Sequence, residues 1–335
     1  MKKAIVTVFY NKNNNAGPKA QMDVIKFLKP LNYTDVTLPF DVRSRLGKFK
    51  YALYDLPKFF RNSNYDIVIF QYPIFSEFLV NQITKNVRKY TNAKLYFITH
   101  DIDSLRASEK DEEFQKREIE QLNQTDGLIV HNQVMKKWLE KQGITVPMIE
   151  LGIFDYDNHE IIKNNINYKK RICFAGNLEK APFLEKLTLK SAHMEIYGSN
   201  PAKSYKSGVI YKGQFSPNDL LKHLDQDFGL VWDGNSIETC DGRYGNYLRY
   251  NNPHKASLYL SMGIPVIIWK EAALAKFISK NNLGITIDSL NNLDKVLDQI
   301  TENEYKTMKS NVLRISEKLR NGSNILNAVE KMERM

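Results

Sequence analysis

The chain has 335 residues, a formal net charge of +10 and two cysteines. Its content of 42% hydrophobic and 11% aromatic residues is that of folded domains and excludes a disordered protein. Its apolar runs are too short to cross a bilayer, and residues 1–10 predict a first strand because no small-residue cleavage site follows them. Two thiols outside any metal-ligand spacing indicate a reducing compartment, so we expect a cytoplasmic protein without a metal site.

The positive charge fits an acidic partner such as a nucleotide diphosphate or an anionic membrane face. No nucleic-acid motif accompanies it, so we expect no nucleic-acid partner. One basic stretch, residues 41–62, interleaves lysines and arginines with leucines and phenylalanines. This pattern is typical of a helix packed on its own domain or of a segment lying on an anionic membrane, and Pro57 argues against one unbroken helix.

The first half of the chain alternates predicted strands with predicted helices. This rhythm predicts an α/β domain with a doubly wound parallel sheet, in which ligands bind at the carboxyl ends of the strands. Strands are expected over 4–10, 65–73, 94–99, 127–130 and 146–151, with helices beginning near Lys19, over 108–125 and after Asn132.

Two stretches of this half follow predicted strands and are candidate ligand contacts. The loop 11–18 contains Gly17 and leads to Lys19, but it lacks the GxGxxG dinucleotide fingerprint. His100 and Asp101 follow the strand 94–99. Such a pair can supply a general base oriented by a carboxylate or bind an acceptor hydroxyl; a hydrogen-bonded loop pair is the alternative.

The second half repeats the strand–helix rhythm after a linker over 155–167. Its first strand leads into Gly176 and Asn177, with Lys180 shortly after. A glycine at that point lets the backbone approach a phosphate, and the lysine adds positive charge. Further strands are expected over 194–198, 209–215, 228–232, 264–269 and 284–287, with helices over 256–262 and 270–282 and two more to the end.

The most informative stretch is 226–269. It reads as a strand ending at Asp233, a polar loop, the run Asn-Asn-Pro-His-Lys over 251–255, a helix and another strand. Pro253 suits the first helical turn, whose N–H groups can hold an anion such as a diphosphate. His254 and Lys255 add donors and charge beside those N–H groups.

The block WDGNSIETC…YGNYLRYNNPHKASLYLSMGIPVIIW resembles the bacterial β-1,6-galactofuranosyltransferases. It is also similar, more distantly, to the streptococcal glucosyltransferases that extend the glycan on serine-rich adhesins. The resemblance implies a GT-B fold, with two Rossmann-like doubly wound domains facing a central cleft. We expect these domains at 1–155 and 156–314, with 315–335 returning to the first domain.

The resemblance also implies inverting, metal-independent transfer of galactofuranose or glucose from a UDP-sugar, with no cofactor. The acceptor would be a glycan on a lipid carrier or a glycoprotein. We also expect peripheral contact with the inner membrane face and a homo-oligomer. His100, Asp101 and Asp233 stay open as the general base. The expected donor-side residues are Gly17, Lys19, Gly176, Asn177, Lys180, Phe215 (on uracil), Asp233, Tyr250, Asn251, Asn252, Pro253, His254 and Lys255, of which Lys255 also stabilises the leaving diphosphate.

Two other functions use the same fold. A sugar-nucleotide epimerase would need no acceptor, and product analysis without acceptor separates the two. A non-catalytic partner subunit would bind a glycoprotein, but the run 251–255 argues against it.

Overall fold

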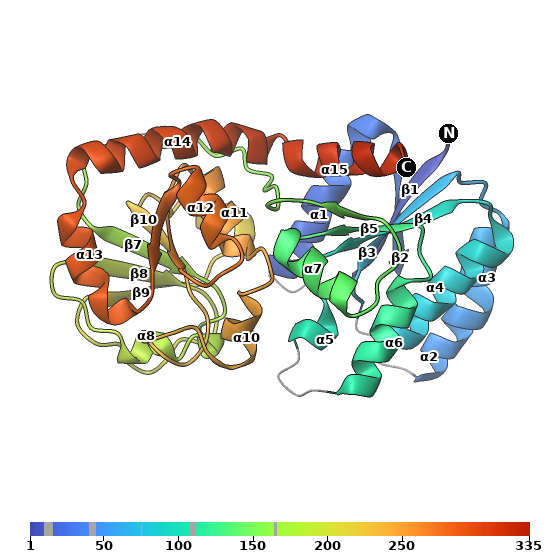
Figure 1. Cartoon of the computed structure of the whole chain (residues 1–335), viewed down its shortest axis with the longest axis horizontal. Coiled ribbons are helices and arrows are strands. Elements are labelled where there is room, and N and C mark those ends of the chain that lie inside the picture. The colour runs from blue at the N-terminus through green and yellow to red at the C-terminus, as the bar shows by residue number, and fades with distance from the viewer. Residues whose placement is uncertain (10–15, 40–44, 75, 107–110, 164–165) are drawn as a thin grey trace. The chain divides into compact units, whose positions relative to one another are not determined.

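The computed structural model describes residues 1–335 except 10–15, 40–44, 75, 107–110 and 164–165 (Figure 1). Its contacts divide the chain into two compact units. Unit 1 comprises Met1–Gly152 with Ile325–Met335, and unit 2 comprises Ile153–Asn324. Residues 315–324, expected to return to the first domain, belong to unit 2, because α14 (Glu302–Arg320) packs against α11 (His254–Ser261) of that unit.

Unit 1 is built on a six-stranded parallel sheet of order β2-β1-β3-β4-β5-β6. Its strands are β1 (Lys3–Phe9), β2 (Tyr33–Pro39), β3 (Ile67–Tyr72), β4 (Lys94–Thr99), β5 (Gly127–Val130) and β6 (Met148–Glu150). Its helices are α1 (Ala16–Leu28), η1 (Lys29–Leu31), α2 (Arg45–Lys50), η2 (Tyr51–Asp55), α3 (Leu56–Arg61), α4 (Glu77–Tyr90), α5 (Asp103–Arg106), α6 (Glu112–Leu122), α7 (Gln133–Lys141) and most of α15 (Ser323–Glu333).

Unit 2 is built on a second parallel sheet of order β12-β11-β10-β7-β8-β9. Its strands are β7 (Arg171–Ala175), β8 (His193–Tyr197), β9 (Val209–Gly213), β10 (Phe228–Val231), β11 (Val266–Trp269) and β12 (Gly284–Ile287). Beside α11 and α14, its helices are η3 (Leu178–Lys180), α8 (Phe183–Lys186), α9 (Pro217–Leu221), α10 (Gly242–Tyr247), α12 (Ala275–Lys280), η4 (Leu290–Asn292) and α13 (Leu293–Gln299).

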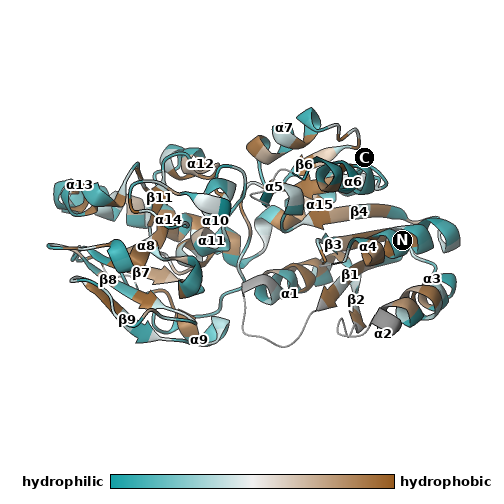
Figure 2. Ribbon diagram, turned by 90° about the horizontal axis from the view of Figure 1, so that it is seen from below, coloured by the Kyte–Doolittle hydropathy of each residue, from teal (hydrophilic) through white to brown (hydrophobic). Residues whose placement is uncertain are grey.

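The central strands of both sheets are apolar because helices cover both of their faces. All six residues of β3 and all four of β10 and β11 are buried. Figure 2 shows the strands of the two sheets mainly brown, whereas helices such as α6 and α13 are largely teal. Continuous apolar strands of this kind are the signature of a parallel sheet and not of an alternating antiparallel one.

The structure refines several of the predicted elements. The basic stretch 41–62 is helical from residue 45 in three pieces, and Pro57 lies in the first turn of α3, where its missing N–H is tolerated. Strand β2 and helix α4 were not predicted. The stretch expected as a polar loop after Asp233 contains α10.

The chain's last helix is held on unit 1 by a mostly buried carboxylate. The Lys3 ammonium donates to both oxygens of Glu333, at 2.8 and 2.7 Å, and the Tyr33 hydroxyl donates to Oε1 at 2.6 Å. Burial and this carboxylate raise the pKa of Tyr33 well above its ordinary value. The hydroxyl therefore stays protonated and keeps its hydrogen bond to α15.

Candidate active site

Each sheet has one point where the direction of winding reverses, and ligands of doubly wound proteins bind outside such a point. In unit 2 the chain passes from β7 outward to β8 and β9, and then from β10 outward to β11 and β12. The reversal therefore lies between β7 and β10. In unit 1 it lies between β1 and β3.

Lys255 extends over the reversal point of unit 2 from the first turn of α11. Its Nζ lies 2.5 Å from Asp233 Oδ1, just beyond β10, and 4.8 Å from the ring centre of Phe174 in β7. The two charged side chains are 19% and 20% exposed. A Cβ on Gly176 would lie 3.3 Å from Lys255 Cε. Gly176 therefore leaves room for this lysine.

The run 251–255 forms the start of α11. Pro253 is the N-cap, with φ −68° and ψ 129°, and α11 begins at His254, two residues before the predicted run 256–262. Asn252 is buried, and His254 stacks on Phe154 with ring centres 4.3 Å apart. The Asn251 side-chain oxygen is buried without a hydrogen-bond partner among the described residues. Tyr250 is half-buried, and its N–H donates to Tyr247 O at the end of α10.

The loop after β7 places Asn177 and Lys180 near the same edge. Asn177 caps the short η3 turn by accepting a hydrogen bond from Glu179 N at 3.2 Å. Lys180 lies over the ring of Tyr244 in α10, with 4.7 Å from its ammonium to the ring centre. This cation–π contact connects the β7 loop to the β10 loop.

Phe215 follows β9 and stacks on His223, with ring centres 3.9 Å apart. One face of the ring is therefore covered by His223, and the tilted ring of Tyr197 has its centre 6.2 Å away. Strand β9 is the second neighbour of β7, so the spacing of strands puts β9 about 10 Å from β7.

In unit 1, His100 lies at the end of β4 in a network that also includes ends of β1 and β3. The Gln71 amide nitrogen donates to Thr7 Oγ1 at 2.6 Å and to Gln21 O at 3.1 Å. Because the Gln21 carbonyl can only accept, the Gln71 oxygen must face His100 Nε2, 2.8 Å away. His100 Nε2 therefore carries a proton, and in the neutral ring Nδ1 is the basic nitrogen.

Asp101 is ion-paired with an arginine. Arg106 Nη1 lies 2.7 Å from Asp101 Oδ2, and Arg106 Nη2 lies 2.7 Å from Asp103 Oδ1. The buried Glu118 of α6 holds the same loop by accepting from the N–H groups of Asp103 and Ser104 at 2.9 and 2.8 Å. Arg106 and Glu118 were not among the predicted site residues, because only the fold determines their partners.

Gly17 and Lys19 lie in α1, which begins at Ala16, earlier than predicted. Lys19 Nζ lies 2.5 Å from Asp23 Oδ1, one turn further along the helix, and both side chains are largely buried. Residues 11–15 of the predicted ligand loop lie outside the described residues.

Three further features concern metal binding, the thiols and membrane spans. The described residues hold no group of three or more His, Cys, Asp or Glu side chains placed to bind a metal. Cys173 and Cys240 are free and buried, and burial raises the pKa of both thiols above the ordinary value. Within the described parts of the chain, every helix is too short or too polar to span a membrane.

Two family models match successive parts of the chain. Glucosyltransferase 3-like, N-terminal domain, matches residues 2–153, and Glucosyltransferase 3-like, C-terminal domain, matches residues 172–332. The β-1,6-galactofuranosyltransferase WbbI of Escherichia coli (strain K12) is 33% identical over 275 residues, which cover 80% of this chain and 79% of the relative. Glucosyltransferase 3 of Streptococcus gordonii is 26% identical over 329 residues, which cover 96% of this chain and 95% of the relative.

Solved structures agree at the level of the fold. The lipopolysaccharide outer core galactosyltransferase WaaB (apo form) has a TM-score of 0.62 at 11% identity, over 98% of this chain and 99% of WaaB. An alpha-glucosyltransferase in complex with UDP and a DNA 13-mer has a TM-score of 0.59 at 11% identity, over 99% of this chain and 98% of that transferase. With two doubly wound units, these matches and the sequence relatives show that the chain belongs to the Glucosyltransferase 3-like family of glycosyltransferases and has a GT-B fold.

Proposed function

We propose that the enzyme transfers a hexose from a UDP-sugar to a glycan acceptor, with the donor diphosphate bound where β7 and β10 part. The observation that supports this most directly is Lys255, held beside Gly176 at the start of α11 and paired with Asp233. A diphosphate entering there meets the ammonium and the positive end of the helix dipole. Both stabilise the charge that builds up as UDP leaves.

The remaining proposed donor contacts lie near the same edge of the sheet, where β7 and β10 end. Gly176 and Asn177 would face the phosphates, and Lys180 would add a second positive charge. Tyr250, Asn251, Asn252, Pro253 and His254 would surround the sugar or the ribose. Phe215 would stack on uracil, and two strand spacings from β7 suit the length of a nucleoside diphosphate.

Galactofuranose is the first choice of donor sugar and glucose the second. The relative named for galactofuranosyl transfer is 33% identical, and the one named for glucosyl transfer is 26% identical. Both are glycosyltransferases, so the epimerase and the non-catalytic subunit are not favoured.

We further propose inversion at the anomeric carbon without a metal. Lys255 and the α11 N-terminus would provide the positive charge that a metal ion provides in other transferases. Inversion requires a general base on the acceptor hydroxyl. Among the three candidates, Asp101 is paired with Arg106 and Asp233 with Lys255, so we propose His100 as the base; its Nδ1 is buried in this structure and has to become accessible to the acceptor hydroxyl. Gly17 and Lys19 remain donor-side contacts on α1.

An acceptor on a lipid carrier fits one surface of unit 1. Phe49, Leu53 and Tyr54 are 54%, 68% and 61% exposed, and Lys50 and Lys58 are exposed beside them. Apolar and basic side chains on one helical segment match an anionic membrane, and we propose peripheral membrane contact there. Sedimentation with vesicles containing anionic lipid would test this, and light scattering without lipid would reveal a homo-oligomer instead.

The deciding experiment is calorimetric titration with UDP, UDP-glucose, UDP-galactose and UDP-galactofuranose in EDTA-containing buffer. We expect UDP and one sugar nucleotide to bind, and binding to weaken by about 10- to 100-fold in Lys255→Ala. NMR analysis of the product's anomeric configuration tests inversion. Unchanged UDP affinity in a folded Lys255→Ala protein would refute the donor site.

A further inference from the structure

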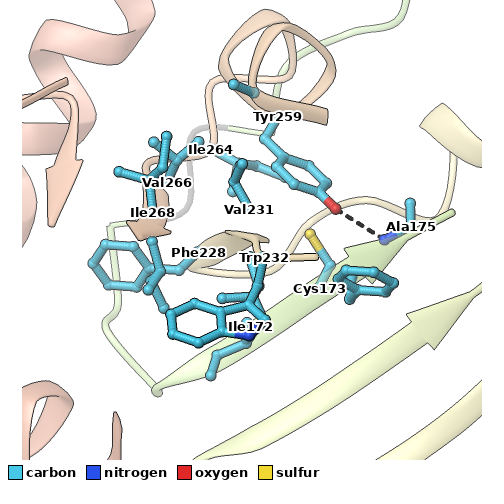
Figure 3. Packing of buried hydrophobic residues seen from close by; sticks show 14 of the residues in the cluster. Ile172, Cys173, Ala175, Phe228, Val231, Trp232, Tyr259, Ile264, Val266 and Ile268 are labelled. Carbon is cyan, nitrogen blue, oxygen red and sulfur yellow. Dashed lines mark hydrogen bonds between the residues drawn. The ribbon is translucent and has the colours of Figure 1, made fainter. Parts of the chain in front are cut away.

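Tyr259 is a fully buried tyrosine in α11 whose hydroxyl contacts the main chain of β7. The Ala175 N–H donates to this hydroxyl at 2.8 Å (Figure 3). Burial raises the pKa of Tyr259 well above its ordinary value, so the hydroxyl stays neutral. A buried polar contact between a helix and a strand needs a structural reason.

The reason lies in how the two central strands part. The Gly176 N–H bonds to Tyr197 O of β8, and successive N–H groups of a strand alternate in direction, so the Ala175 N–H points toward β10. The ladder between β7 and β10, however, pairs Phe228 and Gly229 only with Ile172 and Cys173. The Tyr259 hydroxyl therefore takes the place of the missing strand partner.

Gly229 makes this position of the ring possible. A Cβ on Gly229 would lie 2.2 Å from Tyr259 Cγ and 2.3 Å from Cδ2, far inside van der Waals contact. The aromatic ring therefore lies directly against the main chain of β10. Figure 3 shows the Tyr259 ring above β10, with its hydroxyl directed at Ala175. This one side chain of α11 therefore contacts both central strands.

Lys255 lies one turn earlier on the same face of α11, because residues four apart on a helix are neighbours. Its contacts with Phe174 and Asp233 are at the ends of the same two strands that Tyr259 spans. Any rotation or shift of α11 that breaks the Tyr259–Ala175 bond also moves Lys255 and the first-turn N–H groups.

We propose that Tyr259 is a positioning residue that orients α11 so that Lys255 and the helix start meet the donor diphosphate. This inference rests on the proposed function. It predicts that Tyr259 affects nucleotide binding through Lys255 and the helix start and not through general stability.

A double-mutant cycle tests this coupling, with UDP as the ligand and calorimetry as the readout. In the wild-type background, Tyr259→Phe keeps the ring and removes only the hydroxyl, and we expect UDP affinity to fall about tenfold. In the Lys255→Ala background the same change should weaken UDP binding less, about threefold, because only the first-turn N–H groups are then displaced. Titration to millimolar UDP keeps the weak variants measurable.

The matched control is Tyr168→Phe. Tyr168 is in the same unit and donates to the Leu297 main-chain oxygen at 2.8 Å, so its variant also loses one bond between a tyrosine hydroxyl and the main chain. We expect its UDP affinity to equal that of the wild type. Thermal unfolding of each variant shows that binding is compared between folded proteins.

The outcomes separate the two proposals. Three results would overturn the positioning role of Tyr259. Tyr259→Phe could lower UDP affinity equally in both backgrounds, it could leave UDP affinity unchanged, or Tyr168→Phe could lower UDP affinity by the same factor. Unchanged binding in Lys255→Ala alone would instead overturn the donor site itself.

Discussion

Lys309 of α14 is a buried lysine whose replacement should stabilise the enzyme. It is 4% exposed and lies near Asp227, Arg171 and Asp225. Burial lowers the pKa of Lys309 from 10.5 to about 8, although Asp227 partly opposes the shift. We therefore expect Lys309→Met, which fills a similar volume without a charge, to raise the free energy of unfolding at neutral pH.

The magnitude follows from the pKa difference between the folded and unfolded chain. A lowering of the pKa from 10.5 to about 8 corresponds to about 3 kcal/mol of cost for charged Lys309 below pH 8. Between pH 8 and 10.5 the unfolded chain binds more protons at this site than the folded one. The contribution of Lys309 to the free energy of unfolding therefore rises with pH across that window.

The assay is urea unfolding of the wild type and Lys309→Met at pH 7 and pH 9. The raised pKa values of Cys173 and Cys240 act in the opposite direction, because unfolding releases their protons at alkaline pH. Those contributions cancel in the difference between the two proteins. We expect the variant to be about 2–3 kcal/mol more stable at pH 7, and this advantage to shrink by about 1 kcal/mol at pH 9.

Lys306→Met is the matched control, because Lys306 is exposed on the same helix and pairs with Glu302 at 3.4 Å. Its free energy of unfolding should stay within about 0.5 kcal/mol of the wild type at both pH values. An advantage of Lys309→Met that does not change with pH, or a loss of stability, would refute the reasoning.

Three further predictions concern the site. Gly229→Ala should lower the free energy of unfolding by about 3 kcal/mol, since the new methyl group overlaps the Tyr259 ring; urea midpoints within error of the wild type would contradict it. Gln71→Glu places a carboxylate beside His100 and should move the acid limb of the pH–rate profile up by about one unit, and an unmoved limb would remove His100 as the base. Phe215→Leu should weaken UDP binding about fivefold without affecting inorganic pyrophosphate binding, and equal losses for both would argue against stacking on uracil.

The apolar strands of this chain could be predicted because burial on both faces makes them continuous hydrophobic runs. Residues 228–231 and 266–269 are such runs, and both proved to be central strands of unit 2. Strand β2 was missed because it is not such a run: among its described side chains only Tyr33, Val36 and Leu38 are buried. The helix predicted over 256–262 begins earlier, at His254, since the sequence does not show where the helical hydrogen bonds begin.

The chain order of the strands also indicated which loops would carry polar ligand contacts. Lys255, Asp233 and Gly176 were all candidates from sequence, because each follows a strand or begins a helix, and the fold brings the three together.

What sequence alone determined is therefore the set of side chains that end strands and begin helices, since local pattern and chain direction specify these. Tertiary structure decided which of them pair with each other. The hydrogen bonds of Gln71 with His100 and of Tyr259 with Ala175 join residues 29 and 84 positions apart. No local pattern encodes such contacts, because they depend on which strands become neighbours and on where two of those strands part.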